Sequence, residues 1–432
     1  MAQALYRNVV VVSAGAACWL AGAGEFPSLT LEEAHETALR DHPLISVADL
    51  KALAARQVVR QVQSAFFPNL SANGVGVGDA NSNTRLEAIG ALNSPAIFQR
   101  EAQGLVLSQL ITDFGRTANL TGSAKLRAQA AANSAQATRQ QILLAVDGAF
   151  YSAQHAQAVT RVAEQTLTAR QAFLNQVSAL ASNGLRSDLD ASFARVDLEQ
   201  AKVLLLSAQN DFQASLAQLA ALLGLREPKP YRLVEQGLPP ALSTNVADFV
   251  RQALLYRPDL LSLRDQRDAA SRFARAEKAA RYPAVSAVGA AGLAPVHDTV
   301  LPDSYAAGGV IVSLPLFAGG YYKARQRAAE LEARADEASV RDLEDNVIRD
   351  VRVAWLSSQN AFDRYRVNLQ LLDNARQSYG LAHARYTTGI SSIVEFEQAE
   401  VNLVSAQIAL ATTQYEYLTQ RSVLTFQIGA LR

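Results

Sequence analysis

The residues that could support catalysis or bind a metal are few and widely spaced. The chain has five histidines, and no two of them have the spacing that places metal ligands on one face of a helix; they are His35, His42, His155, His297 and His383. The only cysteine, Cys18, lies in an N-terminal leader, and no G-x-S-x-G nucleophile motif is present. The glycine run GVGVG at 74–78 lacks the spacing of a dinucleotide-binding loop and opens no helix. The sequence therefore predicts no enzyme, no metal site and no cofactor.

Acidic residues instead follow two similar corners in the sequence. The stretch RYTTGISSIVEFEQAE, at 385–400, contains a helix-like run, then Gly389, then two serines and an acidic helical pattern. The stretch ALASNGLRSDLDASFARVD, at 179–197, has the same order around Gly184. Glycine permits the left-handed backbone of a tight turn after a helix. Serines that can cap the next helix follow each glycine; they are Ser187 in the first corner and Ser391 or Ser392 in the second.

The elements that position these corners belong to an internal duplication. Early in the chain the matching prolines differ by 215 positions (258 − 43 = 215 and 283 − 68 = 215). Later the matching glycines differ by 205 positions (389 − 184 = 205 and 429 − 224 = 205). A constant offset over so long a stretch indicates two copies of one structural unit. The predicted domains are a signal peptide at 1–23, a first repeat at 24–224, a linker at 225–244 and a second repeat at 245–430.

Each repeat contains the same parts in the same order. We expect a short helix, a second helix that starts at a proline, a β-hairpin and then two long helices. The predicted bounds are 29–41, 43–65, about 68–111, 116–183 and 187–224 in the first repeat. In the second repeat they are 246–256, 258–280, about 283–317, 320–388 and 391–428.

The long helices carry apolar residues every seven positions. In the first repeat they are Leu198, Leu205, Phe212 and Leu219, and in the second Phe396, Leu403, Leu410, Tyr417 and Leu424. Small residues such as Ala201 and Ala406 stand between them, and this alternation lets helices approach closely as in coiled coils. At 1.5 Å per residue, the segment 116–183 would be roughly 100 Å long. Helices of this length predict a rod or a tube.

The two inserts between the helices predict β-hairpins. Each has strands of about 9 to 12 residues on either side of a polar loop, a length that crosses a bilayer in a tilted barrel strand. A globular β-lobe is the alternative interpretation. Four strands are too few to close a barrel, and an open sheet edge is not tolerated in lipid. Three chains would supply twelve strands.

The N-terminus has the features of an export signal. Arg7 precedes an apolar run from Val9 to Ala23, and Ala21-Gly22-Ala23 fits a cleavage site. Lipidation at Cys18 is the alternative. No later apolar run reaches the roughly 18 residues of a transmembrane helix. Lys plus Arg equal Asp plus Glu at 40 each, and this neutral balance without basic blocks argues against nucleic acid as a partner.

The repeat order and three motifs resemble the TolC family of outer-membrane efflux proteins. The motifs are LSQLITDFGRTAN, VSLPLFAGGYYKAR and YTTGISSIVEFEQAEVNL, and the resemblance covers about 28–430. It implies a mainly α fold with a membrane β-barrel part. Duplicated long antiparallel helices would form a trimeric α-helical barrel, and four strands per chain would complete a 12-stranded β-barrel. It also implies a Gram-negative outer-membrane location with a periplasmic extension, contact with outer-membrane lipid, a periplasmic adaptor and an inner-membrane RND or ABC pump.

The resemblance places functional residues at the two corners, which would be the periplasmic tips. In the family an acidic residue six positions after the glycine faces the pore, and the equivalents are Glu395 and Asp190. A ring of three such carboxylates favours cations. The full set expected at the pore constriction is Glu395, Asp190, Tyr386, Glu397 and Gln398. The set expected at the tip turns and adaptor contact is Gly184, Leu185, Arg186, Gly389, Ile390 and Ser391.

Two questions about function stay open at this point. The chain is expected to be the exit duct of a tripartite export system. Its cargo would be small molecules or drugs in an efflux system and proteins in type I secretion, and the sequence does not distinguish these two kinds of cargo. A periplasmic coiled-coil scaffold is an alternative of another class. It would account for the heptads, but it leaves the export signal, the duplicated hairpins and the glycine corners unexplained.

Overall fold

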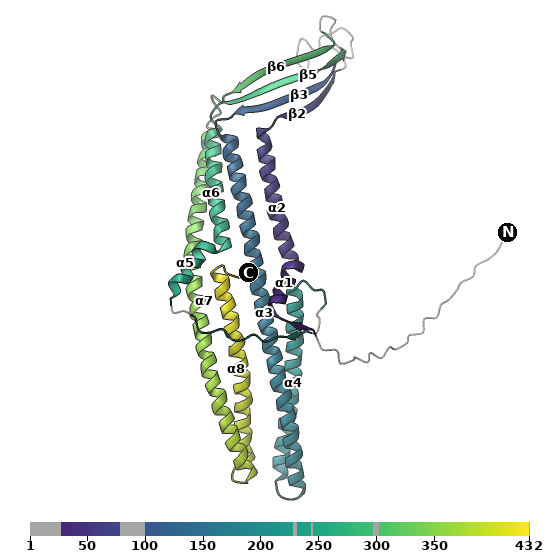
Figure 1. The fold of residues 1–432 in the computed structure, drawn as a ribbon, viewed down its shortest axis with the longest axis vertical. Coiled ribbons are helices and arrows are strands. Elements are labelled where there is room, and N and C mark those ends of the chain that lie inside the picture. Colours follow the sequence, from purple (N-terminus) through teal and green to yellow (C-terminus); the bar gives the residue numbers. More distant parts are fainter. Residues whose placement is uncertain (1–26, 78–99, 228–230, 243–244, 297–301, 432) are drawn as a thin grey trace, which may run out of the picture.

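The protein is an elongated molecule with a sheet at one end and two helical tips at the other (Figure 1). The computed structural model describes residues 27–77, 100–227, 231–242, 245–296 and 302–431. The predicted signal peptide at 1–23 and Cys18 lie outside the described residues.

The short helices follow the predicted order, with two corrections: the first begins two residues late, and the second ends at Gln63, two residues before the predicted 65. These helices are α1 (Leu31–Asp41), α2 (Pro43–Gln63), α5 (Val246–Tyr256) and α6 (Pro258–Ala279), with the 3-10 turn η1 (Ser64–Phe66) after α2. Helix α1 begins two residues later than predicted because Thr30 caps it: Thr30 Oγ1 accepts a hydrogen bond from Glu33 N at 3.2 Å, and the Glu33 carboxylate accepts one from Thr30 N at 2.8 Å. The preceding strand β1 (Ser28–Leu29) pairs in parallel with β4 (Arg232–Leu233) of the linker.

The long helices match the predicted pairs closely. They are α3 (Arg116–Ser182), α4 (Asp188–Leu222), α7 (Tyr321–Thr387) and α8 (Ile393–Gln427). Helices α3 and α7 have 67 residues each, so each is roughly 100 Å long. The predicted small positions are buried, including Ala194, Ala201 and Ala208 on α4 and Ala399, Ala406 and Thr413 on α8. The stripes therefore mark buried faces of the long helices, as predicted, and the coiled-coil packing of these helices stays a prediction.

Two equivalent apolar cores lie midway along the helices and anchor the two repeats. In the first repeat Val146 and Leu219 are buried, and in the second their equivalents Val351 and Leu424 are buried. Each repeat then ends in a glycine with a left-handed backbone, Gly224 (φ 74°) and Gly429 (φ 73°). A Cβ on Gly224 would lie 2.6 Å from the Asp41 carbonyl oxygen, so this glycine is also required for space.

The sheet at the far end is antiparallel and has two open edges. Its strands are β2 (Asn69–Val77), β3 (Arg100–Thr112), β5 (Ala284–Val296) and β6 (Ser304–Ser313), in the spatial order β2-β3-β5-β6. The last strand ends at Ser313, four residues before the predicted end of the second β-hairpin at about 317. Gly104 and Gly292 face each other across β3 and β5, and the Tyr305 hydroxyl lies 2.6 Å from where a Cβ on either glycine would be, which leaves no room for a side chain and helps to fix the register. Among the described residues, no helix is both long and apolar enough to cross a membrane.

Candidate functional site at the helix tips

The two corners have the same backbone geometry, which the sequence predicted. Gly184 has a φ of 70° and Gly389 a φ of 76°. In each corner the residue after the glycine donates a backbone hydrogen bond five residues back: Leu185 N to Leu180 O, and Ile390 N to Arg385 O, both at 2.9 Å. This is the Schellman ending of a helix, and it requires a left-handed residue.

The helix caps after the two glycines differ. Ser187 caps α4, because its Oγ accepts a hydrogen bond from Leu189 N at 3.0 Å. Ser392 is the N-cap residue of α8, but its hydroxyl makes no capping hydrogen bond within the described part of the chain. The Ser391 hydroxyl is buried and finds no hydrogen-bond partner among the described residues. The prediction that a serine side chain caps the second corner is therefore wrong, and the backbone hydrogen bond from Ser391 N to Arg385 O at 3.3 Å holds that corner instead.

Apolar side chains project from both tips. Leu185 and Ile390 are each 71% exposed, although the residue after a Schellman glycine usually packs back on its own helix. Leu189 and Val394, four residues further on, are also exposed and are equivalent in the two repeats (394 − 189 = 205). Sequence reasoning missed this second pair, although the repeat offset was the signal that links it to the first.

Arg186 joins the two tips within one chain. Its guanidinium donates a hydrogen bond to the Tyr386 carbonyl oxygen at 2.5 Å, and its Cζ lies 4.3 Å from the centre of the Tyr386 ring. These contacts bury part of the Arg186 side chain. They join it to the helical hairpin formed by α7 and α8, which we call the second hairpin; α3 and α4 form the first hairpin.

Tyr386 is buried in an aromatic cluster between the hairpins. It is 3% exposed and stacks on Phe396 at a centroid distance of 5.7 Å, and Phe173 lies 4.8 Å from Phe396. Burial raises the pKa of Tyr386, and Asp190 raises it further, so the phenol stays neutral. Its hydroxyl has no hydrogen-bond partner among the residues the structure describes. Tyr386 therefore packs inside the chain, between α3 and α8.

The remaining acidic and polar candidates occupy two environments. Glu395 is exposed and pairs with Arg385 at 3.1 Å. Gln398 is exposed and donates to Asn402 on its own helix at 3.1 Å. Asp190 is partly buried near Tyr386. Glu397 lies about 100° away from Gln398 on the helix, and it faces the contact between the hairpins.

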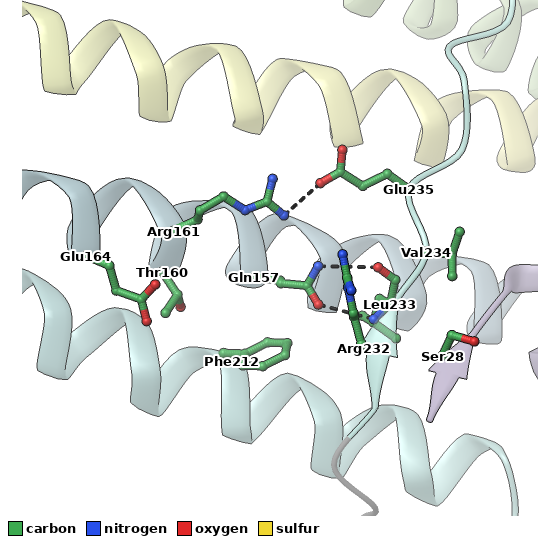
Figure 2. Close-up of a pocket in the computed structure, with 10 residues that line it drawn as sticks. All are labelled: Ser28, Gln157, Thr160, Arg161, Glu164, Phe212, Arg232, Leu233, Val234 and Glu235. Carbon is green, nitrogen blue, oxygen red and sulfur yellow. Dashed lines mark hydrogen bonds and ion pairs between the residues drawn. The ribbon is translucent and has the colours of Figure 1, made fainter. Parts of the chain in front are cut away.

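A separate groove of about 770 Å³ lies midway along the helices, away from the tips. Figure 2 shows Gln157 of α3 bonded to the linker in both directions: it donates to the Leu233 carbonyl at 3.3 Å and accepts from Leu233 N at 3.2 Å. Arg161 pairs with Glu235 across the same groove at 3.0 Å. These contacts fasten the inter-repeat linker to α3, and the groove thus belongs to the scaffold that holds the two repeats together.

Long paired helices, a four-stranded sheet with two open edges, and tips that combine glycine turns with acidic residues are the features of an export channel. The chain belongs to the outer membrane efflux protein family, whose model matches residues 34–225 and 249–430, one segment in each repeat. It is an outer-membrane channel protein of Gram-negative bacteria, as the resemblance predicted. This assignment replaces the alternative of a periplasmic scaffold.

Three known proteins illustrate the relationship. The toluene efflux pump outer membrane protein TtgC of Pseudomonas putida is 26% identical over 419 residues, which cover 94% of this chain and 84% of TtgC. The alkaline protease secretion protein AprF of Pseudomonas aeruginosa is 28% identical over 309 residues, which cover 68% of this chain and 62% of AprF. The crystal structure of the outer membrane protein VceC of Vibrio cholerae has a TM-score of 0.76 at 20% identity, with 92% of this chain and 96% of VceC covered.

Proposed function

We propose that three copies of the chain close into one duct that exports small molecules through a periplasmic adaptor and an inner-membrane pump. The observation that carries the proposal is a set of equivalent positions that are buried in one repeat and exposed in the other. A homotrimer explains this difference, because it covers the exposed set with a neighbouring copy.

The contact between α3 and α6 provides the template for the contact between copies. On α3, Ser123 and Ala130 are buried against α6, whereas the equivalent residues on α7, Ala328 and Ala335, are exposed. On α6, the residues Pro258, Ser262 and Ala269 are buried, whereas their equivalents on α2 are Pro43, Val47 and Ala54, which are exposed. Packing α7 of one copy against α2 of the next would repeat the internal contact and bury both faces.

The open sheet edges support the same arrangement. Strands β2 and β6 each lack a second neighbour among the described strands, and they lie at the two ends of the sheet. Pairing β6 of one copy with β2 of the next would satisfy both edges, as a membrane barrel requires. Three copies would give the twelve-stranded barrel, with outer-membrane lipid around it.

The tips would serve as the gate and as the adaptor contact. Leu185 and Leu189 at the first corner, and Ile390 and Val394 at the second, are exposed. In a trimer such a pair would form an apolar patch at each of six corners, which fits a protein partner. Glu395 and Asp190 would supply carboxylates to the constriction, and three-fold symmetry would make each a ring. Gly184 and Gly389 set the turns that expose these groups.

The contact between copies can be tested by cross-linking. The Ser262 hydroxyl donates to the Ala130 carbonyl at 2.8 Å within the chain, and the equivalent residues on the free faces are Val47 and Ala335. In a Cys18→Ser background, the pair Val47→Cys and Ala335→Cys should cross-link into covalent trimers with a short bis-maleimide. The matched pair Val47→Cys and Glu337→Cys places the second thiol on another face of α7 and should remain monomeric. Cross-linking of the control pair alone would refute the proposed contact between α7 of one copy and α2 of the next.

The cargo can be tested in the native host. Relatives that cover 94% of the chain are named as parts of toluene or antibiotic pumps, and one that covers 91% is named as part of a solvent pump, which favours small apolar molecules as cargo. Deletion of the gene should increase sensitivity to solvents and antibiotics and leave secreted proteins unchanged. Loss of a secreted protein without any change in drug sensitivity would instead assign the chain to type I secretion.

A further inference from the structure

Four charged side chains from three helices meet near the tips, where the two hairpins of one chain touch. Arg170 of α3 is 5% exposed and pairs with Asp197 of α4 and with Glu400 of α8, the latter at 3.0 Å. Glu397 of α8 lies beside Asp197. We refer to Arg170, Asp197, Glu397 and Glu400 as the Arg170 cluster.

The Arg170 cluster holds more negative than positive groups. Three carboxyl groups surround one guanidinium, so full ionisation would leave two uncompensated negative charges in a largely buried site. Asp197 belongs to the first hairpin and Glu397 to the second, and their repulsion would act across the contact between the hairpins. One carboxylate oxygen of Glu397 is buried and has no hydrogen-bond partner among the described residues.

A proton on Glu397 relieves this excess charge. Burial also raises the pKa of Glu400, but Glu400 pairs with Arg170, which opposes that rise. Glu397 faces Asp197 instead, so burial and then the Asp197 charge raise the pKa of Glu397 to about 7. When it is protonated, Glu397 can hydrogen-bond to the Asp197 carboxylate across the contact. Tyr379 and Tyr386 of α7 also lie near the cluster, and burial raises the pKa of both phenols, so they stay neutral.

The Arg170 cluster exists in one of the two equivalent contacts and is absent from the other. In the repeat-related positions, Arg170 becomes Ala375, Asp197 becomes Asn402, Glu397 becomes Ser192 and Glu400 becomes Arg195. These residues lie on α7, α8 and α4, where the chain would meet a neighbouring copy. Any proton dependence of the Arg170 cluster therefore acts between hairpins of the same chain.

We propose that the Arg170 cluster is a proton-operated latch, which holds the two hairpins of one chain together when Glu397 is protonated and releases them when Glu397 loses its proton. On release the O–H bond of the Glu397 carboxyl group breaks and the proton passes to water; apart from this proton transfer, only hydrogen bonds change. The control of hairpin separation stands on the geometry of one chain, whereas any effect on conduction rests on the proposed function.

The direction of the pH dependence follows from the two states. In the closed contact the pKa of Glu397 is about 7, and in a solvated, open contact it returns toward its ordinary value of 4.5. The closed form therefore binds the proton more tightly. The ratio of closed to open tips should fall by at most about tenfold per pH unit between these two values, and this loss should be complete above pH 7.

The latch can be tested by spin-label distances in the full-length protein. Labels at Ser182→Cys and Thr387→Cys, in a Cys18→Ser background and diluted with unlabelled chains, report the separation of the two hairpins by double electron–electron resonance. Both positions are exposed. We expect the long-distance population to grow as the pH rises from about 5 to about 8.

Three variants complete the test. Glu397→Gln should keep the short distance at every pH, and Asp197→Asn should shift the transition to lower pH because it removes the charge that raises the pKa of Glu397. Glu199→Gln, an exposed neighbour on α4 that pairs with Lys202, should behave as the wild type. A wild-type distance that does not change with pH, or a pH response that survives in Glu397→Gln, would overturn the latch. If the spin-label distance changes with pH but the conductance in bilayers does not, the latch is supported and the proposal that the tips are the gate is contradicted.

Discussion

The two repeats share a backbone but differ in the chemistry of their lateral contacts near the tips. Within the chain, Phe173, Tyr386 and Phe396 pack together where α3 meets the second hairpin. The repeat-related residues are Ser378, Ala181 and Ala191, which are all small, and of these only Ser378 is exposed. The two repeats therefore share helix lengths and corners, while the contact inside the chain is large and aromatic and its repeat-related counterpart is small.

The contact between α3 and α6 also differs from its proposed counterpart between copies, but here the contact inside the chain is polar and the counterpart is apolar. Inside the chain, Asn133 of α3 donates to Asp265 of α6 at 2.8 Å. The equivalent positions on the free faces are Ala338 and Leu50, which are exposed and without charge. An apolar pair is suited to association between copies, because it leaves no buried polar group unsatisfied.

The largest expected effect comes from placing a charge on the free face of α2. Leu50→Asp should abolish trimers, because Ala338 cannot pair with the carboxylate and an uncompensated buried charge costs about 3 to 5 kcal/mol per contact. Size-exclusion chromatography with light scattering measures the assembly. Adding Ala338→Asn rebuilds the internal Asn133–Asp265 pair and should restore trimers. The control Arg60→Asp, on another face of α2, should assemble normally.

The next effect concerns the aromatic contact inside the chain. Phe396→Ala should weaken the hairpin contact by about 3 kcal/mol, because it removes a fully buried ring. Hydrogen exchange should then accelerate in the tip halves of α3 and α8 and stay unchanged in α2 and α6. Uniform acceleration along all helices would mean that the ring supports the whole fold and has no special role at the tips.

A smaller effect on stability distinguishes the glycines of the tip turns from the glycines that end the two repeats. Gly389→Ala should cost about 1 to 2 kcal/mol, from its positive φ alone, because no atom of the described residues other than its chain neighbours lies within 4 Å of the new Cβ. Gly224→Ala should cost roughly 2 to 4 kcal/mol, since its Cβ would also meet the Asp41 carbonyl at 2.6 Å. Calorimetric melting temperatures compare the two variants, and equal shifts would contradict the close approach at Gly224.

The smallest effect is expected at the exposed carboxylates of the constriction. The double variant Glu395→Ala and Asp190→Ala should raise single-channel conductance and lower the cation preference by about twofold, because charges exposed to water interact weakly. Planar-bilayer recordings in asymmetric salt measure both quantities. Unchanged traces would remove these two residues from the gate.

The sequence predicted the elements more completely than the contacts between them. The helix bounds and the corners at Gly184 and Gly389 were readable because proline, glycine and the seven-residue stripes act locally. The roles of Arg186, Arg170 and Phe173 were not readable, because each contacts a residue some 200 or more positions away, and one sequence carries no signal for such pairs. Tyr386 and Glu397 were placed at the pore by resemblance, and the structure shows them facing the contact between hairpins, because their positions on α7 and α8 point toward α3 and α4.

The central claim is that copies of this chain repeat its own internal helix contact to enclose a duct. Native mass spectrometry of the mature protein, extracted from outer membranes in mild detergent, measures this most directly. The account predicts one dominant species with three times the mass of the single mature chain, which Leu50→Asp converts to monomers. A wild-type protein found as a single chain under the same conditions would contradict it.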